Sequence, residues 1–226
     1  MPKLLELFAG TGSVGKAFGA LGWEVVSLDI EPGHDIQADI LTWDYRTAYP
    51  SGHFDCVHAS PPCTEYSRAK TTGVRNLELA DSILQRTMDI ITFYDSTVFI
   101  LENPYTGMMK DRPPMFLMDI YLRVVTYCKY GMPYRKATAI WTNLYHHWTP
   151  RPVCNKHMPC ESLRDGRHPQ SAQLAPAKVG GVRRASADDS FKREQLYALP
   201  AELCRELAEA ATRAVAARSR SVRGDV

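Results

Sequence analysis

The sequence lacks any apolar run long enough to cross a membrane. A membrane-spanning helix needs about 20 consecutive apolar residues, and no segment of the 226-residue chain offers them. The first residues also lack the charged and apolar regions of a secretory signal peptide. We therefore expect an intracellular protein, in the cytoplasm of a bacterial host, or in the nucleus if the source is eukaryotic or viral.

The sequence also has little excess charge of either sign. A net charge of +2 does not by itself identify a nucleic-acid-binding protein, because such proteins usually concentrate positive charge. Basic residues nevertheless cluster locally. The clusters are Arg68, Lys70 and Arg75; Arg183, Arg184, Lys192 and Arg193; and the basic residues of segment 213–226. We expect the last segment to be a disordered tail.

The six cysteines follow no disulfide framework and favour free thiols or a metal site. Cys154, His157, Cys160 and His168 lie in a proline-rich stretch and could form a small zinc site. Their spacing matches no standard zinc pattern, so we favour an exposed loop with scattered cysteine and histidine, and predict no bound metal. Three other cysteines lie in expected strands or helices and are predicted to be core residues. They are Cys56, Cys128 and Cys204.

Short apolar or β-branched runs alternate with amphipathic stretches, which is the pattern of a doubly wound α/β sheet. The expected strands cover 4–8, 23–28, 54–59, 97–101, 122–127 and 138–142, and segment 77–94 is an expected helix. A Gly/Pro turn joins the last two strands into an antiparallel pair. With 45% hydrophobic residues, the chain can bury one full core, so we expect a single domain.

A glycine turn follows the first expected strand. Gly10 and Gly12 permit a tight turn, and Ser13 is the expected N-cap of the next helix. A strand, glycine turn and helix in this order let a nucleotide approach backbone N–H groups. Asp29 ends the second strand, where a carboxylate can accept hydrogen bonds from ribose hydroxyls, and Asp39 could end the third.

A cysteine follows two prolines at the end of the strand over 54–59. Pro61 and Pro62 restrict their own φ angles and favour an extended conformation in the residue before them, so Cys63 lies on a stiff loop where α/β sheets bind ligands. This position favours a nucleophile, although a small buried residue in a turn is the alternative.

At this point the chain resembles the cytosine-C5 DNA methyltransferases, in a compact form like those of phages and viruses. The family motifs Phe-x-Gly-x-Gly, Pro-Pro-Cys-x-x-Phe-Ser and Glu-Asn-Val are similar to 8–12, 61–67 and 102–104, in the same order. The resemblance covers residues 1–145 and implies the Rossmann-like, S-adenosylmethionine-dependent methyltransferase fold, with a mostly parallel seven-stranded sheet and an antiparallel last strand.

The resemblance also implies the site. Cys63 would attack carbon 6 of cytosine, Glu102 would contact N3 and the exocyclic amine, and Asn103 would hold the loop that positions Glu102. A thiol with a pKa of about 8.5 is mostly protonated at neutral pH, so we expect the local surroundings to activate Cys63. S-adenosylmethionine would contact Phe8, Ala9, Gly10, Thr11, Gly12, Ser13, Asp29, Ile30, Asp39, Ile40 and Pro61. DNA would contact Ser67, Arg68 and Lys70.

The sequence departs from the family at three places. Pro104 replaces the valine of Glu-Asn-Val, and a final Gly-Asn motif is missing. In the family's arginine stretch Tyr134 replaces glutamine, Lys136 stands at the first arginine, and Arg135 is displaced by one position. Either basic residue could contact the base, but lysine lacks the planar fork of arginine.

The family comparison suggests four segments. They are a catalytic core (1–145), an irregular insert or reduced target-recognition segment (146–185), a C-terminal helical element (186–212) and the basic tail (213–226). Such a short insert predicts relaxed or short-site recognition, or dependence on a partner. Double- or single-stranded DNA is the expected substrate, and RNA is not excluded.

Two other functions stay open. An amino-methyltransferase acting on adenine or cytosine has the same fold and a Pro-Pro-aromatic loop, but it needs no thiol. A non-catalytic relative that only binds the cofactor would fit the altered arginine stretch.

Overall fold

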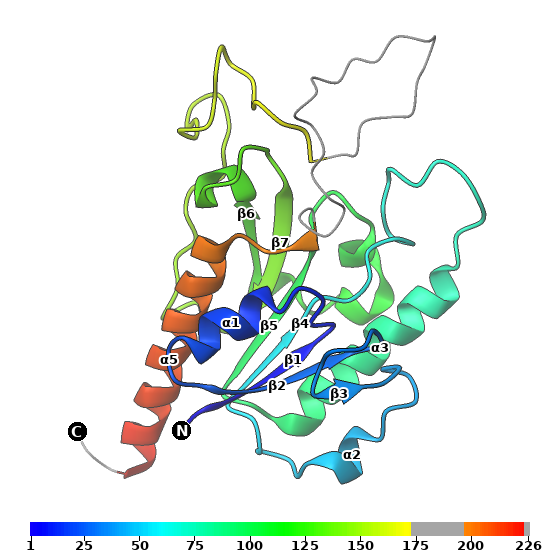
Figure 1. The fold of residues 1–226 in the computed structure, drawn as a ribbon, viewed down its shortest axis with the longest axis vertical. Coiled ribbons are helices and arrows are strands. Elements are labelled where there is room, and N and C mark those ends of the chain that lie inside the picture. The colour runs from blue at the N-terminus through cyan, green and yellow to red at the C-terminus, as the bar shows by residue number, and fades with distance from the viewer. Residues whose placement is uncertain (173–196, 224–226) are drawn as a thin grey trace.

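The computed structural model describes residues 1–172 and 197–223. Within these residues, seven strands form one sheet in the order β3-β2-β1-β4-β5-β7-β6 (Figure 1). The strands are β1 (Lys3–Leu7), β2 (Glu24–Asp29), β3 (Ile36–Gln37), β4 (Cys56–Ala59), β5 (Val98–Pro104), β6 (Leu122–Thr126) and β7 (Ala137–Thr142). β7, the last of these seven strands in chain order, is antiparallel to both of its neighbours, and the other pairs are parallel. The predicted fold class is confirmed.

Helices cover both faces of the sheet (Figure 1). The α-helices are α1 (Ser13–Gly19), α2 (Tyr45–Ala48), α3 (Leu77–Tyr94) and α5 (Ala201–Arg223), and four 3-10 helices are η1 (Met109–Asp111), η2 (Pro113–Met115), η3 (Asp119–Tyr121) and η4 (Tyr127–Tyr130). Helices α1 and α5 pack on one face, and α2 and α3 pack on the other. Side chains of a strand alternate between faces, so Leu4 and Leu5 of β1 enter opposite cores.

Helix α3 has the bounds that its sequence predicts. Asn76 caps its first turn, because its side-chain oxygen accepts a hydrogen bond from Leu79 N at 3.0 Å. Its apolar face buries Ala80, Leu84 and Ile90 against the sheet. The helix leads back into β5, the strand that carries Glu102.

Three local expectations are wrong. Gly12, in the left-handed region at φ 66°, is the N-cap of α1, so Ser13 is the first helical residue instead of the cap. Cys128 is buried but lies in η4, because β6 ends at Thr126. The predicted disordered tail is helical as far as Arg223, because α5 continues through residue 213, where Ala214 belongs to the core that α5 shares with α1 and Val215 packs against it.

The segment predicted to be irregular is irregular where it is described. Between Leu144 and 172 the backbone forms only turns and one isolated bridge, between Arg164 and Arg167. The basic cluster of Arg183, Arg184, Lys192 and Arg193 lies outside the described residues. No described helix is long and apolar enough to cross a membrane.

Candidate active site

A cavity of about 310 Å³ opens at the carboxyl ends of β1, β4 and β5. The glycine turn, the Pro-Pro-Cys loop and the end of β5 all line it. Its lining includes Phe8, Ala9, Gly10, Thr11, Ser13, Asp29, Pro61, Cys63, Glu102, Asn103 and Lys136. The structure therefore brings most of the predicted site residues into one place.

The glycine turn between β1 and α1 is held by Asp29. Gly10 N donates to Asp29 Oδ2 at 2.9 Å, and Glu31 N donates to Asp29 Oδ1 at 3.0 Å. Phe8 and Gly10 have φ values of 58° and 50°, in the left-handed region that side chains rarely adopt. This turn leaves the backbone near Ala9 and Gly10 open to the cavity.

The Cys63 loop is tied to β5 through Asn103. Asn103 Nδ2 donates to the Pro61 carbonyl oxygen at 2.9 Å, and both groups are buried. Glu102 lies in β5 itself and is not positioned by a loop. Asn103 therefore holds the loop that carries Cys63, instead of a loop that positions Glu102. One strand end thus sets the position of both the thiol and the carboxyl group.

Burial raises the pKa of the Cys63 thiol above its ordinary value, Lys136 lowers this pKa, and Glu102 raises it. The expected activation of Cys63 is therefore wrong for the protein alone. The ammonium group of Lys136 lowers the pKa of Cys63 and so opposes the effect of burial.

Glu102 is 6% exposed. Burial raises the pKa of its carboxyl group, while Lys136 and a hydrogen bond from Tyr127 lower it. Tyr127 Oη donates to Glu102 Oε1 at 3.3 Å. A buried carboxyl group with a raised pKa keeps its proton more readily, which suits a proton donor.

The two candidate basic residues, Lys136 and Arg135, lie in different surroundings. Lys136 lines the cavity, with its Nζ 4.8 Å from the centre of the Tyr127 ring. Arg135 is absent from the lining, and its Nε donates to the Cys154 carbonyl oxygen at 3.2 Å. Of these two basic residues, Lys136 is therefore the one that lies beside Cys63.

Some predicted cofactor residues do not line the cavity. Gly12, Ile30, Asp39 and Ile40 are absent from its lining. Asp39 instead stabilises the turn that follows it, since its Oδ1 accepts from Leu41 N at 2.9 Å. Strand β3 ends at Gln37, so the tip of the third strand is two residues earlier than expected.

The predicted nucleic-acid residues follow Cys63 on an exposed loop and do not line the cavity. Lys70 Nζ donates to both carboxylate oxygens of Glu65 at 2.6 Å. Arg68 is freer, with a side chain that is 69% exposed and 4.0 Å from Asp111. Lys70 therefore stabilises the loop, whereas Arg68 presents its charge to solvent.

Two buried polar residues of the cavity were missed. Glu6 and His58 lie opposite each other on β1 and β4. Burial raises the pKa of Glu6 to about 7 and lowers the pKa of His58 to about 3. Neither ring nitrogen of His58 has a hydrogen-bond partner among the described residues. A single polar residue inside each apolar strand was the signal that could have found them.

Residues of the C-terminal part also reach the cavity. Tyr197 and Leu199 contribute to its lining, just before α5 begins. The sequence offered only a weak similarity to the family's final motif here, so this contribution was not predicted.

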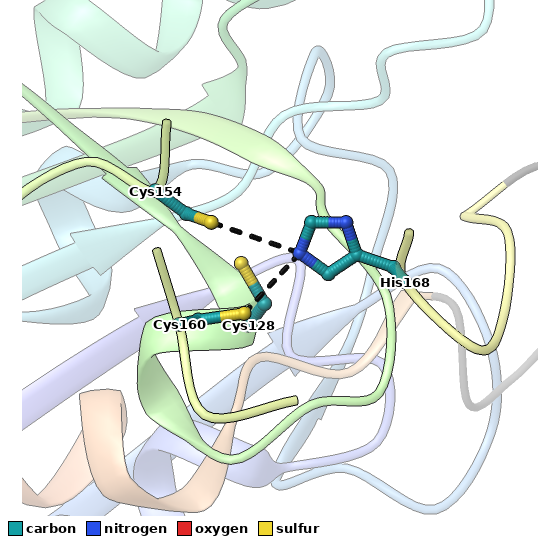
Figure 2. Close-up of side chains that lie close together, drawn as sticks. All are labelled: Cys128, Cys154, Cys160 and His168. Atoms are coloured by element: carbon teal, nitrogen blue, oxygen red, sulfur yellow. Dashed lines mark hydrogen bonds between the residues drawn. The ribbon is translucent and has the colours of Figure 1, made fainter. Parts of the chain in front are cut away.

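A second cluster of reactive side chains lies outside this cavity (Figure 2). Cys128, Cys154, Cys160 and His168 point toward one another, and their ligand atoms all lie within 4.8 Å of one another. His157, predicted as a weak candidate, is exposed and outside the cluster, and Cys128 takes its place. The expectation of scattered side chains is wrong, because η4 brings Cys128 to the loop.

No protein-family model matches the chain. A protein of Frog virus 3 (isolate Goorha), named "Probable DNA (cytosine-5)-methyltransferase", is 33% identical over 185 residues, which cover 76% of this chain and 82% of that protein.

Solved structures match the chain at lower identity. The methyltransferase EhMeth of Entamoeba histolytica has a TM-score of 0.50 and 11% identity, over 68% of this chain and 56% of that chain. A mutant of Spodoptera frugiperda DNMT2 has a TM-score of 0.46 and 16% identity, over 76% of this chain and 58% of that chain. This chain thus spans little more than half the length of these two structures. Because the viral relative matches over most of both chains, this chain belongs to the DNA (cytosine-5)-methyltransferase family.

Proposed function

We propose that the protein transfers a methyl group from S-adenosylmethionine to carbon 5 of cytosine in DNA through a covalent Cys63 adduct. The observation that carries the proposal is the common cavity of Cys63, Glu102 and the glycine turn. The viral relative's name supports the same reaction.

The cavity fits a cofactor of this kind. Its volume of about 310 Å³ lies at the lower end of the range for ligand pockets, about 300–1,000 Å³. Phe8, Ala9, Gly10, Thr11, Ser13 and Asp29 would hold the nucleoside part beside the start of α1. The unpaired nitrogens of His58 offer a further polar contact. When bound, S-adenosylmethionine supplies an electrophilic methyl group.

The residues of the chain make the cytosine ring reactive. The Cys63 thiolate forms a bond to carbon 6, and Glu102 donates its proton to N3, which leaves carbon 5 as an enamine-like nucleophile. Lys136 stabilises the thiolate, because its ammonium group lowers the pKa of Cys63. After methylation, a base from solvent takes the carbon 5 proton, the electrons of the carbon 5–hydrogen bond expel the Cys63 thiolate, and N3 returns its proton to Glu102.

The substrate base has to leave its stack. A cytosine inside a duplex hides carbon 6, so the enzyme would flip the base out or act on single strands. Arg68, with its exposed guanidinium group, would contact the phosphate backbone beside the opening. The short insert after β7 favours relaxed or short-site recognition, or help from a partner.

A trapping experiment tests the proposal. The protein is incubated with labelled S-adenosylmethionine and DNA that contains 5-fluorocytosine, which blocks the final elimination. We expect a covalent protein–DNA adduct on a denaturing gel, with the DNA attached to Cys63 in mass spectrometry. In Cys63→Ser, methylation of ordinary DNA should fall by at least about 10³-fold.

The control variant is Cys204→Ala, which removes a thiol buried in the α5 core and should still form the adduct. Methyl label on an amino nitrogen, with Cys63→Ser still active, would replace the proposal with an amino-methyltransferase. Calorimetric binding of S-adenosylmethionine without methylation of DNA or RNA would indicate a non-catalytic relative.

A further inference from the structure

The described part of the segment after β7 has almost no core of its own. Between 149 and 172 it forms only turns and one bridge. Its separate buried cluster consists of Cys128, Cys154 and Cys160, with Leu163 packed against them. Three cysteines and a leucine bury too little apolar surface to fix a loop of this length. Another interaction therefore has to hold the segment in place.

The side chains in this cluster have the geometry of a four-ligand metal site. His168 Nε2 lies 3.3 Å from Cys160 Sγ and 3.7 Å from Cys154 Sγ, as the dashed lines of Figure 2 mark. All four ligand atoms, including Cys128 Sγ, lie within 4.8 Å of one another. Zinc–sulfur bonds of about 2.3 Å and zinc–nitrogen bonds of about 2.0 Å place tetrahedral ligand atoms roughly 3.5–3.8 Å apart.

We propose that Cys128, Cys154, Cys160 and His168 bind one structural zinc ion. Three thiolates and one imidazole fill a tetrahedral shell, so no position is left open for a catalytic water. Soft sulfur ligands in this geometry select zinc over magnesium or calcium. A disulfide would use only two of the three sulfurs and would give His168 no role.

The surroundings of the cluster support bound zinc. Three thiolates around Zn²⁺ carry a net charge of −1, and two cations lie on the adjoining backbone. Lys129 Nζ donates to the Pro159 carbonyl oxygen at 2.7 Å, and Arg135 Nε donates to the Cys154 carbonyl oxygen at 3.2 Å. Cys154 N also donates to Thr126 Oγ1 at 2.9 Å, which joins this ligand to the end of β6.

The zinc ion would join two distant parts of the chain. Cys128 lies in η4, between Tyr127, which donates to Glu102, and the stretch that leads to Lys136. The other three ligands lie on the loop after β7. The metal would thus fix the β6–β7 connection, and with it two side chains of the active-site cavity. The metal proposal itself does not depend on the methylation reaction.

Metal analysis of the purified full chain tests the proposal. We expect close to one zinc ion per chain by mass spectrometry after extensive dialysis. After replacement of zinc by Co²⁺, we expect the visible absorption of a tetrahedral thiolate site and a thiolate-to-cobalt charge-transfer band. Cys160→Ser and His168→Ala should bind zinc at least tenfold more weakly, whereas His168→Cys should retain it, because a fourth thiolate completes the same shell.

The matched control is His157→Ala, which removes an exposed imidazole from the same loop and should leave the zinc content unchanged. A folded wild-type protein that takes up neither zinc nor Co²⁺ under reducing conditions would overturn the proposal. Full zinc content in both Cys160→Ser and His168→Ala would overturn it too. Neither the wild-type measurement nor the cobalt spectrum depends on a variant that folds.

Discussion

At the scale of single residues, Lys136 acts on two titrating groups at once. Its ammonium group lowers the pKa of both Cys63 and Glu102, while burial raises both. The reactive form needs a thiolate at Cys63 and a proton on Glu102. Because a thiol ordinarily has a much higher pKa than a carboxyl group, the two groups titrate in the opposite order to the one that the reaction needs.

This order predicts a pH profile with a plateau. Below the pKa of Glu102 the rate rises with pH, because the thiolate fraction grows. Between the two pKa values the gain in thiolate cancels the loss of protonated Glu102, and above the pKa of Cys63 the rate falls. Lys136→Met should move both limbs of the profile to higher pH. The measurement is the single-turnover methylation rate at saturating DNA.

Tyr127→Phe is the matched control for this profile. It keeps the ring but removes the hydrogen bond that lowers the pKa of Glu102, so only the acid limb should move to higher pH. Limbs that stay in place in Lys136→Met would show that the lysine does not act on these two groups.

For single residues, the sequence identified some members of the site and missed others. Motif order identified Cys63 and Glu102 as candidates, and the structure brings them to one cavity. It could not choose between Arg135 and Lys136, because the direction of each side chain depends on where β7 begins. Glu6 and His58 each stand out as a polar residue in an apolar strand, but only strand pairing shows that they lie side by side.

At the scale of elements, helix α1 approaches β1 closely at Gly15. A β-carbon at Gly15 would lie 2.5 Å from Glu6 Oε2 and 3.0 Å from Val25 Cγ1. Gly15→Ala should therefore lower the free energy of unfolding by about 1–3 kcal/mol, since Glu6 is also held by Gly15 N at 3.0 Å. Urea denaturation measures this change.

Gly19→Ala supplies the comparison within the same helix. Nothing lies within 4 Å of a β-carbon at Gly19, so alanine should leave stability unchanged or raise it by about 0.5–1 kcal/mol. Equal effects of the two substitutions would mean that the contact between α1 and Glu6 does not limit the size of residue 15.

Elements with a clear apolar period were predicted well. The helix Leu77–Tyr94 and every strand of the sheet except the two-residue β3 were predicted from apolar runs or from residues that recur on one face. The sequence indicated Cys154, Cys160 and His168 as weak zinc candidates, but it could not supply the complete cluster, because Cys128 reaches these residues only through the folded β6–β7 connection.

At the scale of the whole molecule, the C-terminal helix belongs to the core. Ala214 is buried, Arg213 Nη2 donates to the His147 carbonyl oxygen at 2.9 Å, and Arg218 Nη1 donates to Thr97 Oγ1 at 3.1 Å. The disordered tail was predicted from the arginines of this segment, and the alanines between them were not considered. The periodic alanines are the signal that α5 continues.

Removal of residues 213–226 should therefore lower the free energy of unfolding by about 1–3 kcal/mol, measured by urea denaturation. A shorter deletion of 219–226 removes described side chains that are exposed and should have little effect. If both truncated proteins were as stable as the full chain, the last turns of α5 would contribute no packing.

The route of the chain has a consequence for its synthesis. Helix α5 packs against α1, and Leu199, just before α5, forms part of the cavity wall. A growing chain on the ribosome thus makes the nucleophile loop early, but it cannot complete the wall of the ligand pocket until α5 has left the exit tunnel. Newly made molecules should become able to bind nucleoside ligands only after α5 has emerged and packed on α1.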